Sequence, residues 1–105
     1  MSDEKPAKKT HAVVELEEPL VRGEQSVAKV TLRKPTAGDF RGTTMAAAYQ
    51  MDPVALSKVI SRISDPTISA AEYLAMDADD AAALGGEVVD FLLTKREKAR
   101  HGLTE

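Results

Sequence analysis

Apolar and polar residues alternate most clearly over residues 26–33, which is the pattern of a half-buried β-strand. One face of this strand carries Ala28, Val30 and Leu32, and the other carries Val27, Lys29, Thr31 and Arg33. A weaker alternation over residues 11–18 predicts a preceding strand that ends at Pro19, and Gly23 supplies turn chemistry between the two. The pattern predicts a β-hairpin whose apolar side must pack on later helices or on another chain, because an isolated hairpin is only marginally stable.

A proline and a helix cap follow the second strand directly. Pro35 has no N–H to donate to a ladder and favours extended backbone at the preceding residue, so the strand should stop there. Thr36 and Asp39 have the spacing of a capping box, with Asp in place of the usual Glu. Asp39 also suits the positive end of a helix. These signals predict one helix over residues 37–49.

Three more helices are predicted downstream. Asp52, Ser69 and Asp77 are the expected N-caps, and residues 64–66 (Ser-Asp-Pro) separate the first of these helices from the second. Two of the helices carry clear apolar stripes, made of Leu56, Val59, Ile60 and Ile63 in one and of Ala81, Leu84, Val88, Phe91 and Leu92 in the other. The predicted fold class is α+β, with an N-terminal β-hairpin followed by three or four short α-helices and flexible termini.

Length and charge limit the classes of function. At 105 residues the chain makes one domain with a modest core, which favours a binding protein over an enzyme with a deep cleft. We expect a disordered N-terminal arm at residues 1–10, a folded domain at residues 11–93 and a charged tail at residues 94–105. The net charge is −3, and the two ends contribute +1 and +2, so the folded part carries −6. An acidic body argues against binding to nucleic acid.

No catalytic, cofactor or metal site can be assembled from the sequence. Asp77 opens an Asp-x-Asp pattern like that of a calcium loop, but Ala81, Ala82 and Val88 stand where a ligand, a glycine and the bidentate Glu are needed. The acids there are better explained as neutralising a helix N-terminus. The two histidines lie at opposite ends of the chain, and there is no cysteine. We therefore expect a non-enzymatic protein without cofactors. The absence of a long apolar run predicts a soluble protein without a membrane partner.

A candidate partner-binding surface lies on the predicted helix 37–49 and just beyond it. Three small residues spaced four apart would let another backbone approach closely, and a methionine-rich cluster suits a contact surface that must adapt to varied helices. The six residues are Gly38, Gly42, Met45, Ala46, Tyr49 and Met51. A role as gap-filling core residues is the alternative for Met45, Tyr49 and Met51. If the stripe binds a client, a bulky residue at Gly42 should abolish that binding.

A basic strand face leaves a second class of function open. Lys29, Thr31, Arg33 and Lys34 could enter the major groove of DNA, as in a small ribbon-type transcriptional regulator. Against this, the strand is expected to pair within its own chain, the body is acidic and further helices follow. Solvated lysines and arginines explain the face more simply.

Residues 17–93 resemble the tail assembly chaperone family of temperate, contractile-tailed phages, labelled tail protein E, 41 or 14. The most distinctive stretch is residues 30–42, Val-Thr-Leu-Arg-Lys-Pro-Thr-Ala-Gly-Asp-Phe-Arg-Gly. Residues 19–24, 52–64 and 84–92 are also similar to the family. No catalytic residues come with the resemblance.

The resemblance implies a chaperone that coats the long helical tape measure protein and helps to recruit tail tube protein around it. It also implies action in the host cytoplasm and absence from the mature virion, with a structural subunit kept in the virion as the contrasting possibility. In many such phages a ribosomal frameshift yields a longer form, so this chain would be the short form. Homo-oligomers are a further expectation.

Overall fold

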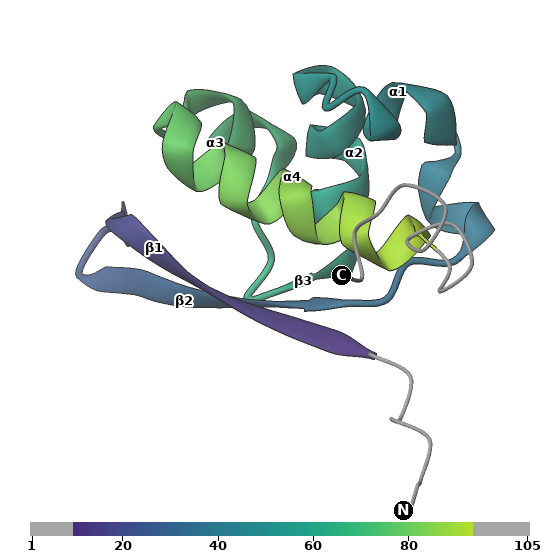
Figure 1. Cartoon of the computed structure of the whole chain (residues 1–105). Coiled ribbons are helices and arrows are strands. Elements are labelled where there is room, and N and C mark those ends of the chain that lie inside the picture. The colour runs from purple at the N-terminus through teal and green to yellow at the C-terminus, as the bar shows by residue number, and fades with distance from the viewer. Residues whose placement is uncertain (1–9, 94–105) are drawn as a thin grey trace, which may run out of the picture.

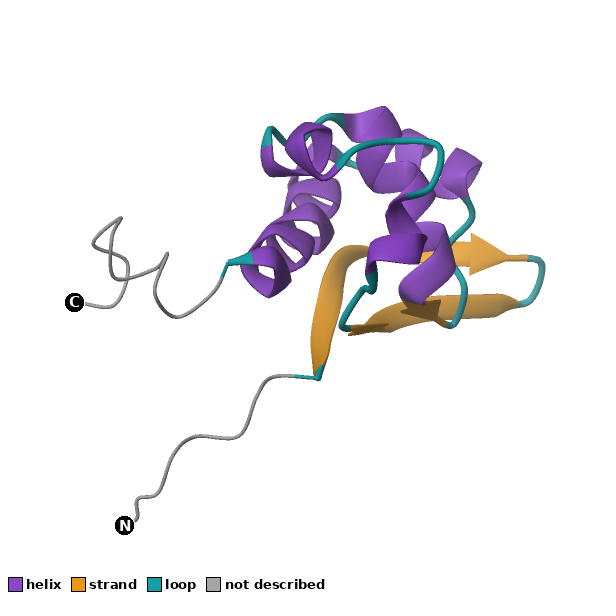
Figure 2. Cartoon of the chain, turned by 90° about the vertical axis from the view of Figure 1, so that its right-hand side faces the viewer, coloured by secondary structure: helices purple, strands orange, loops and turns teal. Residues whose placement is uncertain are grey.

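The computed structural model describes residues 10–93 as a three-stranded antiparallel sheet with helices packed on one face (Figure 1, Figure 2). The elements in chain order are β1 (His11–Arg22), β2 (Gln25–Arg33), the 3-10 helix η1 (Ala37–Phe40), α1 (Met45–Tyr49), α2 (Pro53–Ile63), β3 (Ser64–Asp65), α3 (Ala70–Ala75) and α4 (Ala78–Leu92). This confirms the predicted α+β class. The predicted arm, apart from Thr10, and the predicted tail lie outside the described residues.

The hairpin is longer than predicted, and Pro19 does not end its first strand. β1 continues through Pro19 to Arg22, and its register with β2 is interrupted between Glu15 and Leu20. A bulged stretch is where a strand tolerates proline, because no ladder partner there requires the missing N–H. The turn prediction is confirmed, since Gly23 has a φ of 58°.

Most of the predicted apolar sheet face is correct. Val14, Val30 and Leu32 are buried against the helices, but Ala28 is exposed, contrary to prediction. Val27 is instead the partly buried residue near the hairpin end, where it packs against the core. The irregular pairing explains this change, because a shift in register exchanges the side chains that face each side of a sheet.

The third strand was not predicted. Residues 64–66 were expected only to separate two helices, whereas Ser64 and Asp65 pair with Leu32 and Thr31 of β2. β2 therefore becomes the central strand. A two-residue strand carries too little pattern to be recognised locally, and its pairing depends on α2 delivering it to the edge of β2.

The single helix predicted over residues 37–49 is wrong. The structure has η1, then a turn in which Gly42 adopts a φ of 83°, and then α1. A left-handed residue cannot continue a right-handed helix, and Thr44 caps the new start by accepting a hydrogen bond from the Ala47 N–H at 3.0 Å. Gly38, Gly42 and Ala46 consequently do not form one helical stripe.

The later helices begin as predicted. Asp52 accepts a hydrogen bond from the Val54 N–H at 3.0 Å, and Ser69 accepts one from the Glu72 N–H at 3.0 Å. The apolar residues predicted for α2 are all buried. α4 passes through Gly85 without a break, and a Cβ at this position would lie 2.7 Å from Leu56 Cδ1. This glycine thus permits α4 to pack closely on α2.

Candidate functional site

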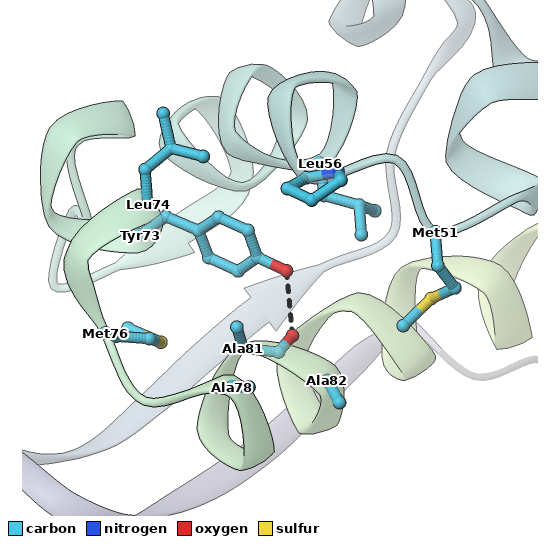
Figure 3. A pocket seen from close by; sticks show the side chains of 9 residues that line it. Met51, Leu56, Tyr73, Leu74, Met76, Ala78, Ala81 and Ala82 are labelled. Atoms are coloured by element: carbon cyan, nitrogen blue, oxygen red, sulfur yellow. Dashed lines mark hydrogen bonds between the residues drawn. The ribbon is translucent and has the colours of Figure 1, made fainter.

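The surface of the described residues contains an apolar groove of about 280 Å³. It lies between the beginning of α2, the end of α3 and the beginning of α4 (Figure 3). The lining residues are Met51, Pro53, Leu56, Tyr73, Leu74, Met76, Ala78, Ala81 and Ala82. The Tyr73 hydroxyl donates a hydrogen bond to the Ala81 carbonyl at 2.8 Å, and burial raises the pKa of Tyr73 to about 12. The tyrosine therefore stays neutral and contributes mainly its ring to the groove.

Short side chains and helix ends create the groove. The floor of the groove on α4 is made of short side chains, namely Ala78, Ala81 and Ala82. Met51, which follows the end of α1, and Met76, which follows the end of α3, lie at opposite ends of the groove (Figure 3). Together these residues surround a hollow that opens to solvent and lacks charged side chains in its lining.

Met51 occupies an unusual backbone position. Its φ is 62°, its N–H donates to the Ala48 carbonyl at 2.9 Å, and the Asp52 N–H donates to the Ala47 carbonyl at 3.0 Å. These two bonds define a Schellman motif, in which the left-handed residue is usually glycine. A methionine there costs about 1 kcal/mol in backbone energy. In this unfavourable conformation, the Met51 side chain lines the groove.

All six residues of the predicted partner surface are exposed, but they do not form one site. Exposed fractions of 43%, 41% and 37% for Met45, Tyr49 and Met51 rule out the alternative that these three are core residues. Of the six residues, Met51 alone lines the groove. The Tyr49 hydroxyl donates to the Leu92 carbonyl at 3.0 Å. The partner role of the six residues stays a prediction.

The two glycines of that surface lie in a different environment. Gly38 belongs to η1, and the Gly42 carbonyl accepts a hydrogen bond from Lys58 Nζ at 2.9 Å. Because Gly42 has a positive φ, a bulky residue there would strain the backbone whether or not a client binds. Substitution of Gly42 is therefore not a clean test of partner binding.

The sequence prediction missed most of the groove. Leu74 is 51% exposed, and Tyr73 and Met76 supply a wall of the groove beside it. One local signal was present. Tyr73 and Leu74 are adjacent large apolar residues in a six-residue helix, and neighbours 100° apart cannot both point into the core. Tyr73 is buried and Leu74 faces outward.

Acidic residues stand next to the groove. Exposed Asp52 follows Met51, and exposed Asp77 and Asp79 surround Ala78 at the other end. Residues 70–93 contain six acidic residues and no lysine or arginine. The charge of Glu72 is paired with a base, since Arg22 Nε and Nη2 donate to its carboxylate at 3.0 and 2.9 Å, whereas Asp52, Asp77 and Asp79 are exposed beside the groove. The rim is thus negatively charged.

Asp80 has a role that the helix-end interpretation did not capture. It is 2% exposed, and its two carboxylate oxygens accept hydrogen bonds from the Glu17 and Glu18 N–H groups at 2.8 and 3.0 Å. These N–H groups fall in the interrupted part of the β1–β2 register. The Asp80 side chain therefore fastens the bulge of β1 to the beginning of α4.

The distinctive motif at residues 30–42 builds a structural junction. Arg33 donates two hydrogen bonds to the Asp39 carboxylate at 2.8 and 3.0 Å, and a third to the Arg62 carbonyl at 3.0 Å. The hydrogen bond from Arg33, with help from the Thr36 N–H, lowers the pKa of Asp39 to about 2. Arg62 in turn donates to the carbonyls of Asp39 and Arg41 at 2.9 and 2.7 Å. The motif joins β2, η1 and the end of α2.

This junction weakens the case for a DNA-binding ribbon. Arg33 is committed to Asp39, and Lys29 lies 3.7 Å from the Glu15 carboxylate on the same sheet face. A basic face whose arginine is paired within the chain has fewer free positive charges with which to bind phosphate.

In the described part of the chain, no group of three or more His, Asp or Glu side chains is placed to hold a metal ion. None of the helices within residues 10–93 is long and apolar enough to cross a membrane.

Comparison with known proteins identifies the family. The family described as phage tail assembly chaperone proteins, E, or 41 or 14, matches residues 13–93. The chain belongs to this family. It is similar to tail assembly protein E′ of Escherichia phage P2, with 41% identity over 83 residues, which cover 79% of this chain and 58% of that protein. It is also similar to tail assembly protein E of the same phage, with 42% identity over 80 residues, or 76% of this chain and 88% of that protein.

The matches to these relatives therefore cover most of protein E but little more than half of protein E′. No solved structure matches the chain. The expected family is confirmed, and the relatives carry tail assembly in their names.

Proposed function

We propose that this protein is a non-enzymatic chaperone that binds the tape measure protein of its phage and assists assembly of the tail tube around it. Membership of the tail assembly chaperone family carries the proposal. The apolar groove with its exposed rim supports it, because a protein that keeps a helical client soluble needs unsatisfied apolar surface.

The chaperone acts in the host cytoplasm and leaves before the virion is complete. Tail tube protein and a longer, frameshifted form of the chain are further proposed partners, alongside self-association. The chaperone needs no cofactor.

Co-expression with the tape measure protein of the same phage tests the proposal. We expect the tape measure protein to remain soluble and to co-purify with the tagged chain, and to aggregate when the chain is omitted. Aggregation in both cultures, with no co-purification, would contradict the role.

Two further measurements separate the alternatives. Mass spectrometry of purified virions should find none of this chain, whereas a structural subunit would be present in fixed amount. Salt-sensitive DNA binding that is lost when Lys29 and Arg33 are replaced would instead favour the regulator.

A further inference from the structure

We infer that the apolar groove binds an amphipathic helix whose large apolar side chains are flanked by lysine or arginine, and that this helix is a segment of the tape measure protein. The inference rests on the proposed function and assigns the contact to the surface formed by α2, α3 and α4.

The size of the groove fits side chains better than a free ligand. Its volume of about 280 Å³ falls just below the ~300–1,000 Å³ of typical small-molecule pockets. The lining offers no charged group and no unpaired hydroxyl, since Tyr73 donates to the Ala81 carbonyl. Such a hollow can hold apolar side chains that project from a partner, but its lining has no free polar side chain with which to orient a small molecule.

A helix is the secondary structure that the surroundings favour. The groove is bordered by three helices and by no strand, so an incoming strand would find no sheet edge to extend. Met51 and Met76 stand at its two ends, and methionine side chains adapt to varied apolar partners. The left-handed backbone at Met51 is consistent with selection for a side chain at this place, because glycine would cost less.

The charge of the rim specifies the flanks of the partner. Asp52 lies beside one end of the groove and Asp77 and Asp79 beside the other, and all three are exposed. The helices α3 and α4 contain no basic residue that could neutralise them. A helix with basic residues on both sides of its apolar stripe would meet opposite charge at each end.

The chain itself offers a poor occupant. In α2 the basic side chains Lys58 and Arg62 already donate to backbone carbonyls of the η1 turn, and α1, α3 and α4 contain no lysine or arginine. Residues 94–105 include four basic residues, but Leu103 is their one large apolar residue. Neither a second copy nor this segment therefore combines an apolar stripe with basic flanks.

Two neighbouring alanines of α4 give a matched test. Ala82 lines the groove, while Ala83 is also exposed and does not line it. The variants Ala82→Arg and Ala83→Arg add the same side chain and charge to the same helix, and both should keep the far-ultraviolet circular dichroism and melting temperature of the wild type. Overlapping purified fragments of the tape measure protein serve as the probe, with affinity measured by fluorescence anisotropy.

We expect at least one fragment to bind the full chain, with Ala82→Arg weakening it about tenfold or more, near 1.4 kcal/mol, and Ala83→Arg changing it less than about twofold. Equal effects of the two variants would overturn the groove assignment and leave the proposed function intact. Binding of no fragment by the wild type would overturn both.

The charge requirement has its own variant. Asp52→Asn, Asp77→Asn and Asp79→Asn combined remove three charges and keep side chains that cap helices well. This variant should bind the fragment more weakly at low salt and lose most of the wild-type salt dependence. Salt-independent binding by the wild type, or a bound fragment without basic flanks, would refute the charge assignment. Wild-type self-association that Ala82→Arg abolishes would assign the groove to a second copy instead.

Discussion

Asp80 should be the side chain on which the attachment of β1 to α4 depends. Its carboxylate is almost fully buried and accepts hydrogen bonds from the N–H groups of Glu17 and Glu18. In the variant Asp80→Ala both N–H groups would lose their partner at a place where the β1–β2 register is already interrupted. The bulge would then have to find water or rearrange.

The expected loss of stability follows from those two bonds. A hydrogen bond to a charged group contributes about 1.5–3 kcal/mol, so the pair contributes about 3–6 kcal/mol. Removing the carboxylate offsets part of this loss of stability, because burying a charged group itself costs free energy. We expect the free energy of unfolding to fall by ~3 kcal/mol and the melting temperature by about 12 °C or more. Asp80→Asn should lose about half as much, since its amide oxygen can accept one of the two bonds.

Urea denaturation followed by circular dichroism measures this loss. Asp79→Asn is the control, because Asp79 is exposed and its carboxylate accepts a hydrogen bond from the neighbouring Asp80 N–H at 2.9 Å, within its own helix start. The control should stay within about 0.5 kcal/mol of the wild type. Hydrogen exchange at the Glu17 and Glu18 amides should also accelerate in Asp80→Ala. A loss below about 1 kcal/mol, or equal to that of the control, would refute the reasoning.

Three other changes test separate parts of the structure. The pKa of Asp39 is lowered to about 2 in the folded state, so its ionised form stabilises the fold at any pH above the unfolded-state pKa near 3.8. Asp39→Asn should therefore lower the free energy of unfolding by about 1–2 kcal/mol at neutral pH. In acid denaturation, the difference from the wild type should disappear as the pH falls from about 4 to 2. A loss that persists at pH 2 would contradict the ion pair. In Tyr49→Phe, Tyr73 is the one remaining tyrosine, and absorbance at 295 nm should show it titrating near pH 12. The free energy of unfolding should decline as the pH rises above about 10, because the raised pKa disfavours the phenolate in the folded state. A titration midpoint near pH 10 would indicate an exposed ring. Gly86→Ala should raise the free energy of unfolding measured in urea by about 0.5–1 kcal/mol, because alanine has the higher helix propensity. Gly85→Ala should lower it, because its Cβ would lie 2.7 Å from a methyl group of α2. Equal shifts in the two variants would show that α4 does not pack that closely.

Local signals predicted much of the fold. The alternation around Val30 and Leu32, and the caps at Asp52 and Ser69, were read correctly because each depends on neighbours within a few residues. Where a local signal had two solutions, the prediction failed. Thr36 with Asp39 does cap a helical turn, but the turn is η1, and Gly42 ends it by taking a positive φ.

The candidate site was predicted only in part for the same reason. Met51 was predicted to bind a partner because it lies close in sequence to Met45 and Tyr49, and the structure places it in the lining of the groove. Leu74, Met76 and Ala82 come from segments up to 31 residues further along, and no local pattern links them to Met51. The Gly38 and Gly42 stripe failed because it presumed helical backbone that the chain does not adopt there.

The sequence by itself determined the α+β class, the burial of Val30 and Leu32 on β2, the apolar face of α2, and the family, since these follow from residue order and short-range geometry. Only the tertiary structure decided how far β1 runs, where β3 pairs and which apolar residues remain outside the core. The physical reason is that these features depend on contacts between distant residues. The Asp80 carboxylate accepts a hydrogen bond from the N–H of Glu17, 63 residues away. The groove forms because α4 approaches α2 closely at Gly85, while the short alanine side chains of α4 leave space beside Tyr73.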